Sequence, residues 1–326
     1  MIFVTGGTGF IGSNIVAALN DRGRSDIVIL DSLGCDSKWR NIAKRRFHDI
    51  ITPDRIDAFL KDAPRADAVF HMGAISSTTA SDGDEILRTN IQLSASLWNW
   101  CAARRTPLIY ASSAATYGDG SAGFSDDSSQ KALAQLRPLN LYGWSKHAFD
   151  RWALDRAAAG VAPPQWAGMK FFNVYGPNEA HKGDMQSLVA KNTAAVAAGE
   201  TISLFKSHRD DYQDGQQLRD FVYVADCVAV MMWLFDHPDV SGLFNLGTGK
   251  ARSFLDLTLA IGGALGKNVD VRYVDMPIAI RDRYQYFTQA QMEKLRDAGC
   301  DVKFHTLEEG VADYVLNYLT QPDPYR

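Results

Sequence analysis

The spacing of apolar residues along the chain predicts short buried strands that alternate with longer helices. Apolar runs occupy residues 1–4, 27–30, 68–71 and 108–111, and short runs of this kind are typical of strands buried on both faces. A helix is expected to end before Gly23, after apolar residues at helical spacing: Phe10, Ile11, Ile15, Val16 and Leu19. A second helix is expected over residues 86–104. This alternation predicts an α/β fold with a doubly wound, mostly parallel sheet.

The last third of the chain follows a different pattern. Strand-like runs return at residues 219–224 and 243–246, and capping-box sequences at Thr288 and Thr306 predict two further helices. The first of these should end at Gly299, and the second carries an apolar stripe that we interpret as core packing: Leu307, Val311, Tyr314, Val315 and Tyr318. Residues 119–137, rich in Gly, Ser, Asp and Gln, are predicted to form a mobile loop. A smaller, interleaved C-terminal α/β domain is therefore expected.

Composition narrows the classes of protein. The 326 residues carry a net charge of −4 at pH 7, so neither nucleic acid nor an anionic membrane is expected as a partner. No apolar run approaches the roughly 20 residues of a membrane span, and the chain enters its first strand without a secretory signal pattern. The four cysteines are scattered without metal-ligand spacing, which predicts no metal site, reduced thiols and a cytoplasmic location: Cys35, Cys101, Cys227 and Cys300.

Four glycines fall within seven residues between the first strand and the first helix: Gly6, Gly7, Gly9 and Gly12. Glycines there let backbone N–H groups approach a pyrophosphate at a helix N-terminus. The next strand ends in Asp31, placed to meet a ribose hydroxyl. These features predict a Rossmann dinucleotide-binding domain over residues 1–174 plus about 219–249. Residues 175–218 and 250–326 are then expected to form a substrate-binding domain.

The residues after Asp31 bear on the choice of cofactor. A bare Asp31 would repel a 2′-phosphate and so favours NAD, whereas Lys38 and Arg40 could supply the positive charge that NADP needs. A solvated basic face is the alternative interpretation of these two residues. A segment of small residues follows the strand at 68–71, where a cofactor lies in an open α/β sheet.

Tyr142 and Lys146 lie four residues apart on a predicted helix and therefore share one face. A phenol is a poor base at neutral pH, and we expect the nearby ammonium to lower its pKa. Just upstream, Ser113 ends a predicted strand and offers a hydroxyl that can hold a substrate oxygen. The alternative is a tyrosine packed beside an exposed lysine.

With these three motifs in one order, the chain resembles the extended short-chain dehydrogenase/reductase family, which acts on nucleotide-diphosphate sugars. Its dehydratases have an Asp-Glu pair where this chain has Ala114-Ala115, so the resemblance implies an epimerase or a reductase. Residues 76–79, 172–183, 219–223 and 283–285 are similar to the ADP-L-glycero-D-manno-heptose 6-epimerase branch. That branch implies tightly bound NADP, a homo-oligomer (a pentamer), and transient oxidation at C6″ that converts ADP-D-glycero-D-manno-heptose to its L-glycero epimer for lipopolysaccharide core heptose supply.

The resemblance also implies roles for individual residues. Tyr142 and Lys182 would be the two acid/base groups, with Ser113 orienting the substrate and Lys146 tuning the phenol and binding the ribose. The implied cofactor contacts are Gly6, Gly9, Phe10, Ile11, Gly12, Asp31, Ser32, Lys38, Met72, Gly73, Ala74, Ile75, Ser76, Thr89, Lys146, Val174 and His181. The implied substrate contacts are Ser77, Ser113, Asn173, Asp184, Lys191, Phe205, Lys206, Ser207, His208, Arg219 and Tyr284.

The chain departs from this branch at several positions. Pro53 replaces a cofactor-binding lysine, Ser32 an asparagine and Asp184 a serine, and residues 207–218 look longer and more acidic than the usual loop. Relaxed choice between NADP and NAD is therefore an alternative. Apart from the resemblance, Lys182 would be interpreted as a surface lysine in a turn. Two rival functions stay open: a UDP-hexose 4-epimerase that uses Tyr142 alone as base, and a non-catalytic dinucleotide sensor.

Overall fold

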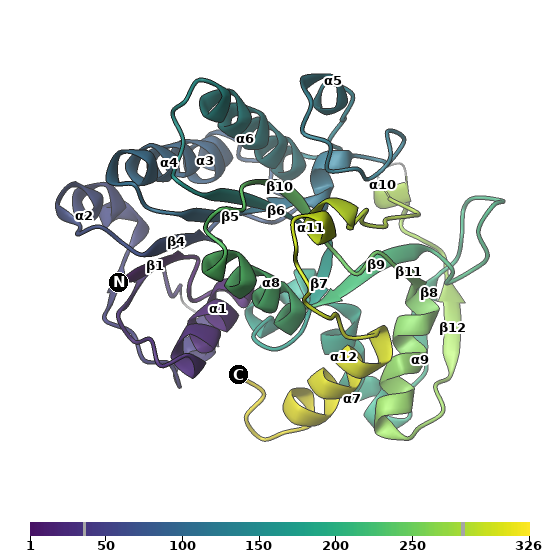
Figure 1. The fold of residues 1–326 in the computed structure, drawn as a ribbon. Coiled ribbons are helices and arrows are strands. Elements are labelled where there is room, and N and C mark those ends of the chain that lie inside the picture. Colours follow the sequence, from purple (N-terminus) through teal and green to yellow (C-terminus); the bar gives the residue numbers. More distant parts are fainter. Residues whose placement is uncertain (35–36, 282–283) are drawn as a thin grey trace.

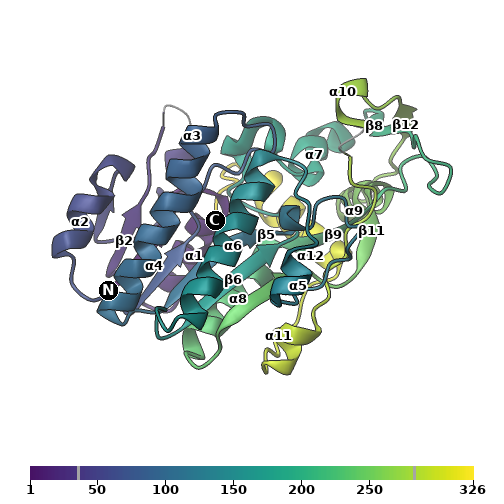
Figure 2. The ribbon, with the colours of Figure 1, turned by 90° about the horizontal axis from the view of Figure 1, so that it is seen from above.

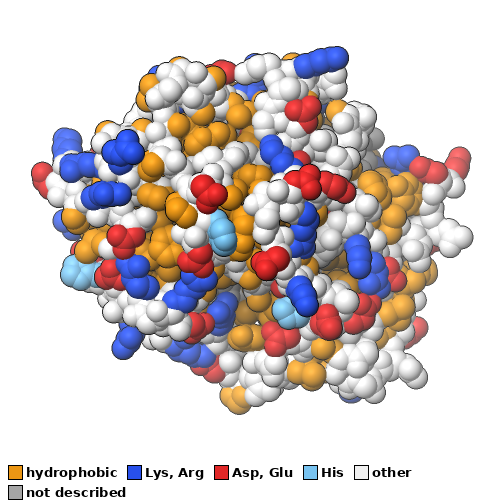
Figure 3. Space-filling view, in the orientation of Figure 1, with side chains coloured by type: hydrophobic (Ala, Val, Ile, Leu, Met, Phe, Trp, Pro, Cys, Tyr) orange, Lys and Arg blue, Asp and Glu red, His pale blue; other side chains and the backbone are white. Residues whose placement is uncertain are grey.

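The computed structural model describes residues 1–34, 37–281 and 284–326. Cys35 and Arg283, both named in the sequence analysis, lie outside these ranges. Among the helices of the described ranges, none is long and apolar enough to cross a membrane. On the face shown in Figure 3, positive and negative side chains are interspersed rather than gathered by sign.

A seven-stranded parallel sheet forms the larger part of the molecule. Its strands are β1 (Ile2–Thr5), β2 (Ile27–Leu30), β3 (Asp49–Ile51), β4 (Ala68–His71), β5 (Leu108–Ser113), β6 (Trp166–Phe171) and β10 (Gly242–Leu246), in the spatial order β10-β6-β5-β4-β1-β2-β3. All neighbours in the sheet are parallel. The order reverses at β1, as in a Rossmann sheet, and the predicted fold class is confirmed.

Helices cover both faces of this sheet (Figures 1 and 2). Ile2 and Val4 of β1 face a core shared with α1 (Phe10–Asp21) and α8 (Val224–Asp236), whereas Phe3 faces the core under α2 (Ile56–Asp62), α4 (Leu93–Arg104) and α6 (Leu141–Ala158). The helix expected over 86–104 is continuous with α3 (Gly83–Ile86), through the π-helical segment η3 (Leu87–Gln92). Strands buried on both faces explain the unbroken apolar runs in the sequence.

The remaining chain builds smaller sheets and a helical cluster. One sheet joins β7 (Asn173–Tyr175), β9 (Leu218–Tyr223) and β11 (Ala251–Ser253), and another pairs β8 (Ile202–Phe205) with β12 (Val271–Val274). The helices α7 (Leu188–Ala198), α9 (Phe254–Leu265) and α12 (Leu307–Tyr314) pack together beside them (Figure 1). Thr306 forms the predicted capping box with Glu309, and most of the predicted apolar stripe is buried.

Two local predictions were wrong. The capping box at Thr288 does not form, and the helix there, α11 (Glu293–Asp297), begins five residues later because the Thr288 hydroxyl instead accepts a hydrogen bond from the Asp220 amide at 3.2 Å. The predicted loop at 119–137 contains a short helix, α5 (Gln130–Leu133), and is anchored rather than loose. Phe124 and Asp126 are buried, and the Asp126 carboxylate accepts a hydrogen bond from the Asn245 amide at 2.9 Å.

The other short elements are helical turns: η1 (Ser37–Ile42), η2 (Pro53–Arg55), η4 (Ala114–Tyr117), η5 (Ala180–Met185), α10 (Ile278–Arg281) and η6 (Val315–Leu319). Of these, η4 follows the end of β5, and η5 packs against η1. Both therefore lie at the edge of the sheet where the strands have their carboxyl ends, which is the edge that positions the site.

Candidate active site

The glycine-rich loop between β1 and α1 packs tightly against the segment after β4. Gly6 has φ +64°, and a Cβ at this position would lie 2.7 Å from the Gly73 nitrogen. A Cβ at Gly12 would lie 2.1 Å from the Gly6 oxygen. The helix α1 has Gly9 as its N-cap, which provides no side-chain cap, and it has no acidic residue in its first turn. A backbone cradle at an uncapped helix N-terminus fits the pyrophosphate of a dinucleotide.

Asp31 follows β2, and its carboxylate is held on several sides. It accepts hydrogen bonds from the backbone amide of Thr8 at 3.0 Å and of Ser32 at 2.8 Å, and from the Thr8 hydroxyl. The Lys38 ammonium lies 3.0 Å from the same carboxylate. Asp31 is therefore not the bare charge considered in the sequence analysis, while Arg40 is exposed. This arrangement suits a ribose, with a lysine beside the carboxylate.

The segment from Met72 to Ser76 is fixed by Asn90, a residue that the sequence analysis missed. The Asn90 side chain accepts from the Ile75 amide at 2.9 Å and donates to the Ile75 carbonyl at 3.0 Å. It also donates to the Ser145 hydroxyl at 3.0 Å. Asn90 thus joins the expected cofactor segment to α6 next to Lys146, while Thr89 beside it is half-buried. An amide within a predicted helix was the only signal in the sequence.

Ser113, Tyr142 and Lys146 come together where β5 meets α6. Lys146 is 3% exposed, and its ammonium donates to the Ala111 carbonyl at 2.8 Å. Burial lowers the pKa of Lys146 to about 8, although the Asp150 carboxylate opposes this change. Burial raises the pKa of Tyr142, and a hydrogen bond with the Ser113 hydroxyl partly offsets it.

The predicted lowering of the Tyr142 pKa by Lys146 was therefore wrong for the protein alone. The physical reason is that burial removes water from the phenolate, while the Lys146 ammonium is engaged by a backbone carbonyl. The positive nicotinamide considered in the sequence analysis is a further source of charge that would act in the opposite direction. Tyr142 thus needs more than Lys146 to become a base.

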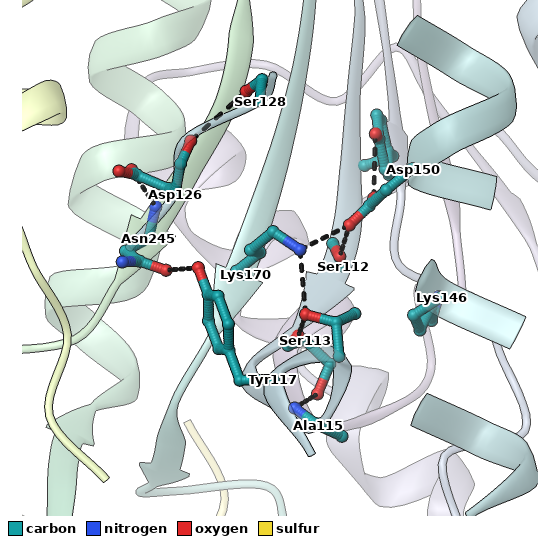
Figure 4. Close-up of polar contacts among 12 residues, drawn as sticks. Ser112, Ser113, Ala115, Tyr117, Asp126, Ser128, Lys146, Asp150, Lys170 and Asn245 are labelled. Atoms are coloured by element: carbon teal, nitrogen blue, oxygen red, sulfur yellow. Dashed lines mark hydrogen bonds and ion pairs between the residues drawn. The ribbon is translucent and has the colours of Figure 1, made fainter. Parts of the chain in front are cut away.

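A buried ion pair lies behind β5 (Figure 4). The Lys170 ammonium on β6 is 2.7 Å from the Asp150 carboxylate on α6, which also accepts a hydrogen bond from the Ser112 hydroxyl at 2.7 Å. Lys170 also donates to the Thr116 hydroxyl at 2.9 Å. The sequence analysis missed both ion-pair residues, although Asp150 stands four residues after Lys146 and Lys170 interrupts an apolar strand.

The turn η5 brings His181 and Lys182 to the glycine-rich loop. A His181 ring nitrogen lies 3.1 Å from the Asn41 amide nitrogen, which donates to the Thr8 carbonyl at 2.9 Å. The Lys182 ammonium lies 5.1 Å from the centroid of the Phe10 ring. Burial lowers the pKa of Lys182, and Glu179 opposes this change. Lys182 is therefore not a fully solvated surface lysine, although within the described ranges no contact joins it to Tyr142.

The residues implied for the substrate form two groups. In the first, Arg219 is 6% exposed and its guanidinium lies between the rings of Phe254 at 5.6 Å and Tyr284 at 5.1 Å. The Phe205 and Tyr284 rings are 6.3 Å apart. Gln285 donates to the Gly118 carbonyl, which joins this group to the turn after Ser113. In the described part of the chain, Arg219 has no carboxylate partner, so its charge suits an anion.

The second group is more exposed and less connected. The Lys191 ammonium donates to the Asp184 carbonyl at 2.6 Å, and Lys206 lies 3.4 Å from Asp275. The Ser77 hydroxyl bonds to Thr79, and the other substrate positions of this group are at least partly accessible: Asn173, Ser207 and His208. No contact among the described residues gathers this second group around Tyr142.

Comparison with known proteins assigns the chain to a family. A model of the NAD dependent epimerase/dehydratase family matches residues 2–247. The chain belongs to this family. It is 49% identical to the ADP-L-glycero-D-manno-heptose-6-epimerase of Nitratidesulfovibrio vulgaris, over 100% of both chains.

Solved structures agree with this assignment. Helicobacter pylori ADP-L-glycero-D-manno-heptose-6-epimerase superposes with a TM-score of 0.78 at 28% identity, covering 97% of this chain and 95% of that one. Thermus thermophilus UDP-glucose 4-epimerase, in complex with NAD, gives 0.74 at 25% identity, covering 96% and 97%. The resemblance to the 6-epimerases and the epimerase class, an isomerase, are confirmed. Members of this family bind a nicotinamide dinucleotide, which the glycine cradle fits.

Proposed function

We propose that this chain epimerises C6″ of ADP-D-glycero-D-manno-heptose to give ADP-L-glycero-D-manno-heptose, with NADP bound throughout. The observation that carries the proposal is the full-length 49% identity to an enzyme of that name. The meeting of Ser113, Tyr142 and Lys146 at one end of α6 supports it, because oxidation of an alcohol needs a base for the hydroxyl proton, and a phenol held beside a hydroxyl and an ammonium can act as that base.

Each side chain has a role in moving one proton. NADP, when bound, supplies the hydride acceptor for the first half of the reaction and the hydride donor for the second. Tyr142 takes the proton of the C6″ hydroxyl as that carbon becomes a ketone, and Ser113 holds the oxygen by a hydrogen bond. After the ketone turns its other face to the nicotinamide, a proton returns to the oxygen. The carbon regains its hydrogen with inverted configuration and there is no net oxidation.

A second acid/base group solves a geometric problem in this reaction. The oxygen points in different directions in the two epimers, so one phenol cannot easily serve both. Lys182 is our candidate for the second group, since burial lowers the pKa of its ammonium and so makes the proton easier to release. Its position over Phe10 lies at the cofactor end of the site.

At the nucleotide end, Arg219 would bind the diphosphate, because its planar guanidinium matches phosphate oxygens and is stacked between Phe254 and Tyr284. Asn173, Asp184, Lys191 and residues 205–208 would contact the rest of the ADP-heptose. We assign the cofactor to residues 1–174 plus about 219–249, and the substrate to the remainder. A homo-oligomer, a cytoplasmic location and a place in lipopolysaccharide core heptose supply belong to the same proposal.

The preference for NADP over NAD is argued from charge. Asp31 alone would repel a 2′-phosphate, but Lys38 lies 3.0 Å from it and offsets its charge. A paired Asp31 is also compatible with NAD, whose 2′-hydroxyl can donate a hydrogen bond to it. We propose NADP as the main cofactor and NAD as a weaker alternative.

The test is proton NMR of the purified protein mixed with ADP-D-glycero-β-D-manno-heptose, first without added cofactor. Conversion to the L-glycero epimer would support the substrate, the reaction and a tightly held cofactor together. Turnover of a UDP-hexose instead, with no heptose conversion even when NADP is supplied, would favour the 4-epimerase function. Absence of turnover with any nucleotide sugar would favour a dinucleotide sensor.

A further inference from the structure

Asp150 and Lys170 form an ion pair with almost no exposure to solvent. Their side chains are 0% and 1% exposed, and their charged atoms are 2.7 Å apart. Burying two charges costs several kcal/mol per ion before their attraction is counted, so such a pair is weak support for stability alone. Its place in this fold points to a different role, because it touches the catalytic segment from behind (Figure 4).

The pair holds the end of β5 at successive residues. Asp150 accepts a hydrogen bond from the Ser112 hydroxyl at 2.7 Å. Lys170 donates to the Thr116 hydroxyl at 2.9 Å, and that hydroxyl donates to the Ser113 carbonyl at 2.9 Å. The backbone that carries the Ser113 hydroxyl is thus fixed on both sides of its Cα, by groups that never reach the substrate.

Asp150 also stands on the catalytic face of α6. Residues 142, 146 and 150 are spaced by four and so lie one above the other along the helix. A carboxylate in this row stabilises the Lys146 ammonium and disfavours a negative charge on Tyr142. Lys170, reaching across from β6, is the group that balances it.

We propose that Lys170 offsets the charge of Asp150, so that Asp150 can anchor the Ser113 segment while disfavouring the Tyr142 phenolate less than an unpaired carboxylate would. Both are positioning residues for the reaction. The inference rests on the proposed function only in that Tyr142 acts there as the base. It assigns to Lys170 a role in setting the pH at which the enzyme works.

Other titratable groups surround residues 142, 146 and 150 and contribute to the electrostatic environment of these three side chains. They come from several elements around the pair: His71 on β4, Tyr110 on β5, Tyr117 on η4, Lys146, His147 and Arg151 on α6, Asp126 and Arg137 in the segments on either side of α5, and Lys294 on α11. Burial lowers the pKa of His71 to about 3, so this ring is neutral where the enzyme would work, and burial also lowers the pKa of His147. Burial raises the pKa of Asp126 and lowers that of Lys294, and each of these two groups opposes the change in the other.

The experiment compares Lys170→Met, Asp150→Asn and the double variant in the cofactor-loaded protein. Lys170→Met leaves the Asp150 charge unbalanced, so the acid limb of the kcat/KM profile should move up by about one pH unit. Asp150→Asn keeps the shape but leaves the Lys170 charge unbalanced, so the limb should move down by about one unit. In the double variant the limb should return close to its wild-type position.

The matched control is Lys294→Met. This change also removes a half-buried ammonium, one that donates to the Asp126 carbonyl at 3.0 Å and the Ser128 hydroxyl at 2.9 Å but does not contact Asp150. The acid limb of this variant should stay in place. If Lys170→Met does not fold, Asp150→Asn and the double variant still give different predictions, because only the first should shift the limb.

A second readout separates this inference from the proposed substrate. Tyrosine labelled with ¹³C at Cζ lets the Tyr142 phenol be titrated by NMR in the loaded protein without substrate, with its signal assigned by its loss in Tyr142→Phe. Opposite shifts in the two single variants support the inference even if the wild type does not turn over ADP-heptose, a result that would overturn the proposed substrate alone. Shifts in one direction, or none, with only slower turnover or lower Tm, would mean that the pair is merely structural and would overturn the inference.

Discussion

The surroundings of Lys182 affect both the position and the pKa of its ammonium. It lies over the ring of Phe10, and burial lowers its pKa while Glu179 opposes that change. Glu179 is itself fully buried and fixed by the Ser187 amide at 2.6 Å and the Ser187 hydroxyl at 2.6 Å. A lysine with a lowered pKa exchanges its proton more readily at neutral pH, which is the property a second acid/base group needs.

Lys182→Met should therefore reduce epimerisation by about a thousandfold or more, as Tyr142→Phe should, while the fold and the bound cofactor are retained. The NMR conversion assay measures the first, and circular dichroism and the absorbance of the bound cofactor measure the second. Lys303→Met, which changes an exposed lysine, is the control. Near-normal turnover of Lys182→Met would rule out the two-base mechanism.

Lys38 is the residue that should distinguish the two nicotinamide cofactors. Its ammonium lies 3.0 Å from Asp31, so Lys38→Ala would leave that carboxylate to repel a 2′-phosphate. We expect the affinity for NADP to fall about tenfold more than that for NAD, measured by titration of the cofactor-stripped protein. Arg40→Ala, at an exposed arginine nearby, is the comparison. Equal losses for both cofactors would mean that Lys38 does not read the phosphate.

At the scale of elements, the start of α1 depends on a close approach that only glycine allows. A Cβ on Gly12 would meet the Gly6 oxygen at 2.1 Å, so Gly12→Ala must push the helix away from the loop. We expect a loss of about 1–3 kcal/mol in the free energy of unfolding and loss of the bound cofactor. Urea denaturation and cofactor absorbance after gel filtration measure the two effects.

The control for this prediction is Gly263→Ala on α9, where an added Cβ meets no atom within 4 Å. It should stabilise the protein by about 0.5–1 kcal/mol, because alanine loses less entropy than glycine in a helix. If Gly12→Ala bound cofactor as the wild type does, the glycine cradle would not be the pyrophosphate site.

The two capping boxes show what the sequence can predict about elements. Thr306 and Thr288 have the same local pattern, yet only Thr306 starts a helix. Thr288 lies beside β9, where its amide donates to the Leu218 carbonyl and its hydroxyl accepts from Asp220. Hydrogen bonds to the distant strand β9 therefore decide that Thr288 does not start a helix. In the parallel sheet, β1, β2, β4, β5 and β10 were predictable because burial on both faces leaves a continuous apolar run, whereas β3 and β6 were not predicted.

The residues of the candidate site also divide into those that the sequence could predict and those that it could not. Tyr142 and Lys146 were predictable because helical spacing places them on one face, and Ser113 because it ends a strand. Asn90 and Lys170 were not predictable, because their roles come from partners far along the chain, Ser145 in one case and Asp150 in the other. Spacing along one element is visible in a sequence, whereas contact between elements is not.

At the scale of the whole molecule, the last residues of the chain return to its first helix. Arg326 lies 3.0 Å from Asp21 on α1, and its amide donates to Asn178 at 3.0 Å. Asp323 lies 2.7 Å from Lys44, just after η1. Figure 1 shows the C-terminus beside α1. We call residues 320–326 the C-terminal strap, and it ties the end of the chain to the elements that hold Asp31 and Lys38.

Removal of residues 322–326 should speed release of the cofactor several-fold while changing stability little. Exposed ion pairs contribute at most about 1 kcal/mol each, but these constrain η1 and α1 directly. The release rate of the bound cofactor is measured by stopped-flow fluorescence after the cofactor-loaded protein is mixed with an excess of competing cofactor. Arg22→Ala is the control, since it breaks another exposed pair at the end of α1, with Asp236 at 3.0 Å. Equal release rates in the truncated and wild-type proteins would show that the strap does not constrain the cofactor site.

The order of strands in the seven-stranded sheet has a consequence for the nascent chain on the ribosome. β6 is completed at Phe171, but its outer neighbour β10 begins only at Gly242, after the residues of β7, α7, β8 and β9 have been made. Until then the edge of a fully buried strand stands open, with its hydrogen-bonding groups available to other chains. Slower synthesis or a lower growth temperature would lengthen that interval. At the same time it would reduce collisions between incomplete chains. The yield of native protein should therefore depend more on chaperone supply than on the stability of the finished sheet.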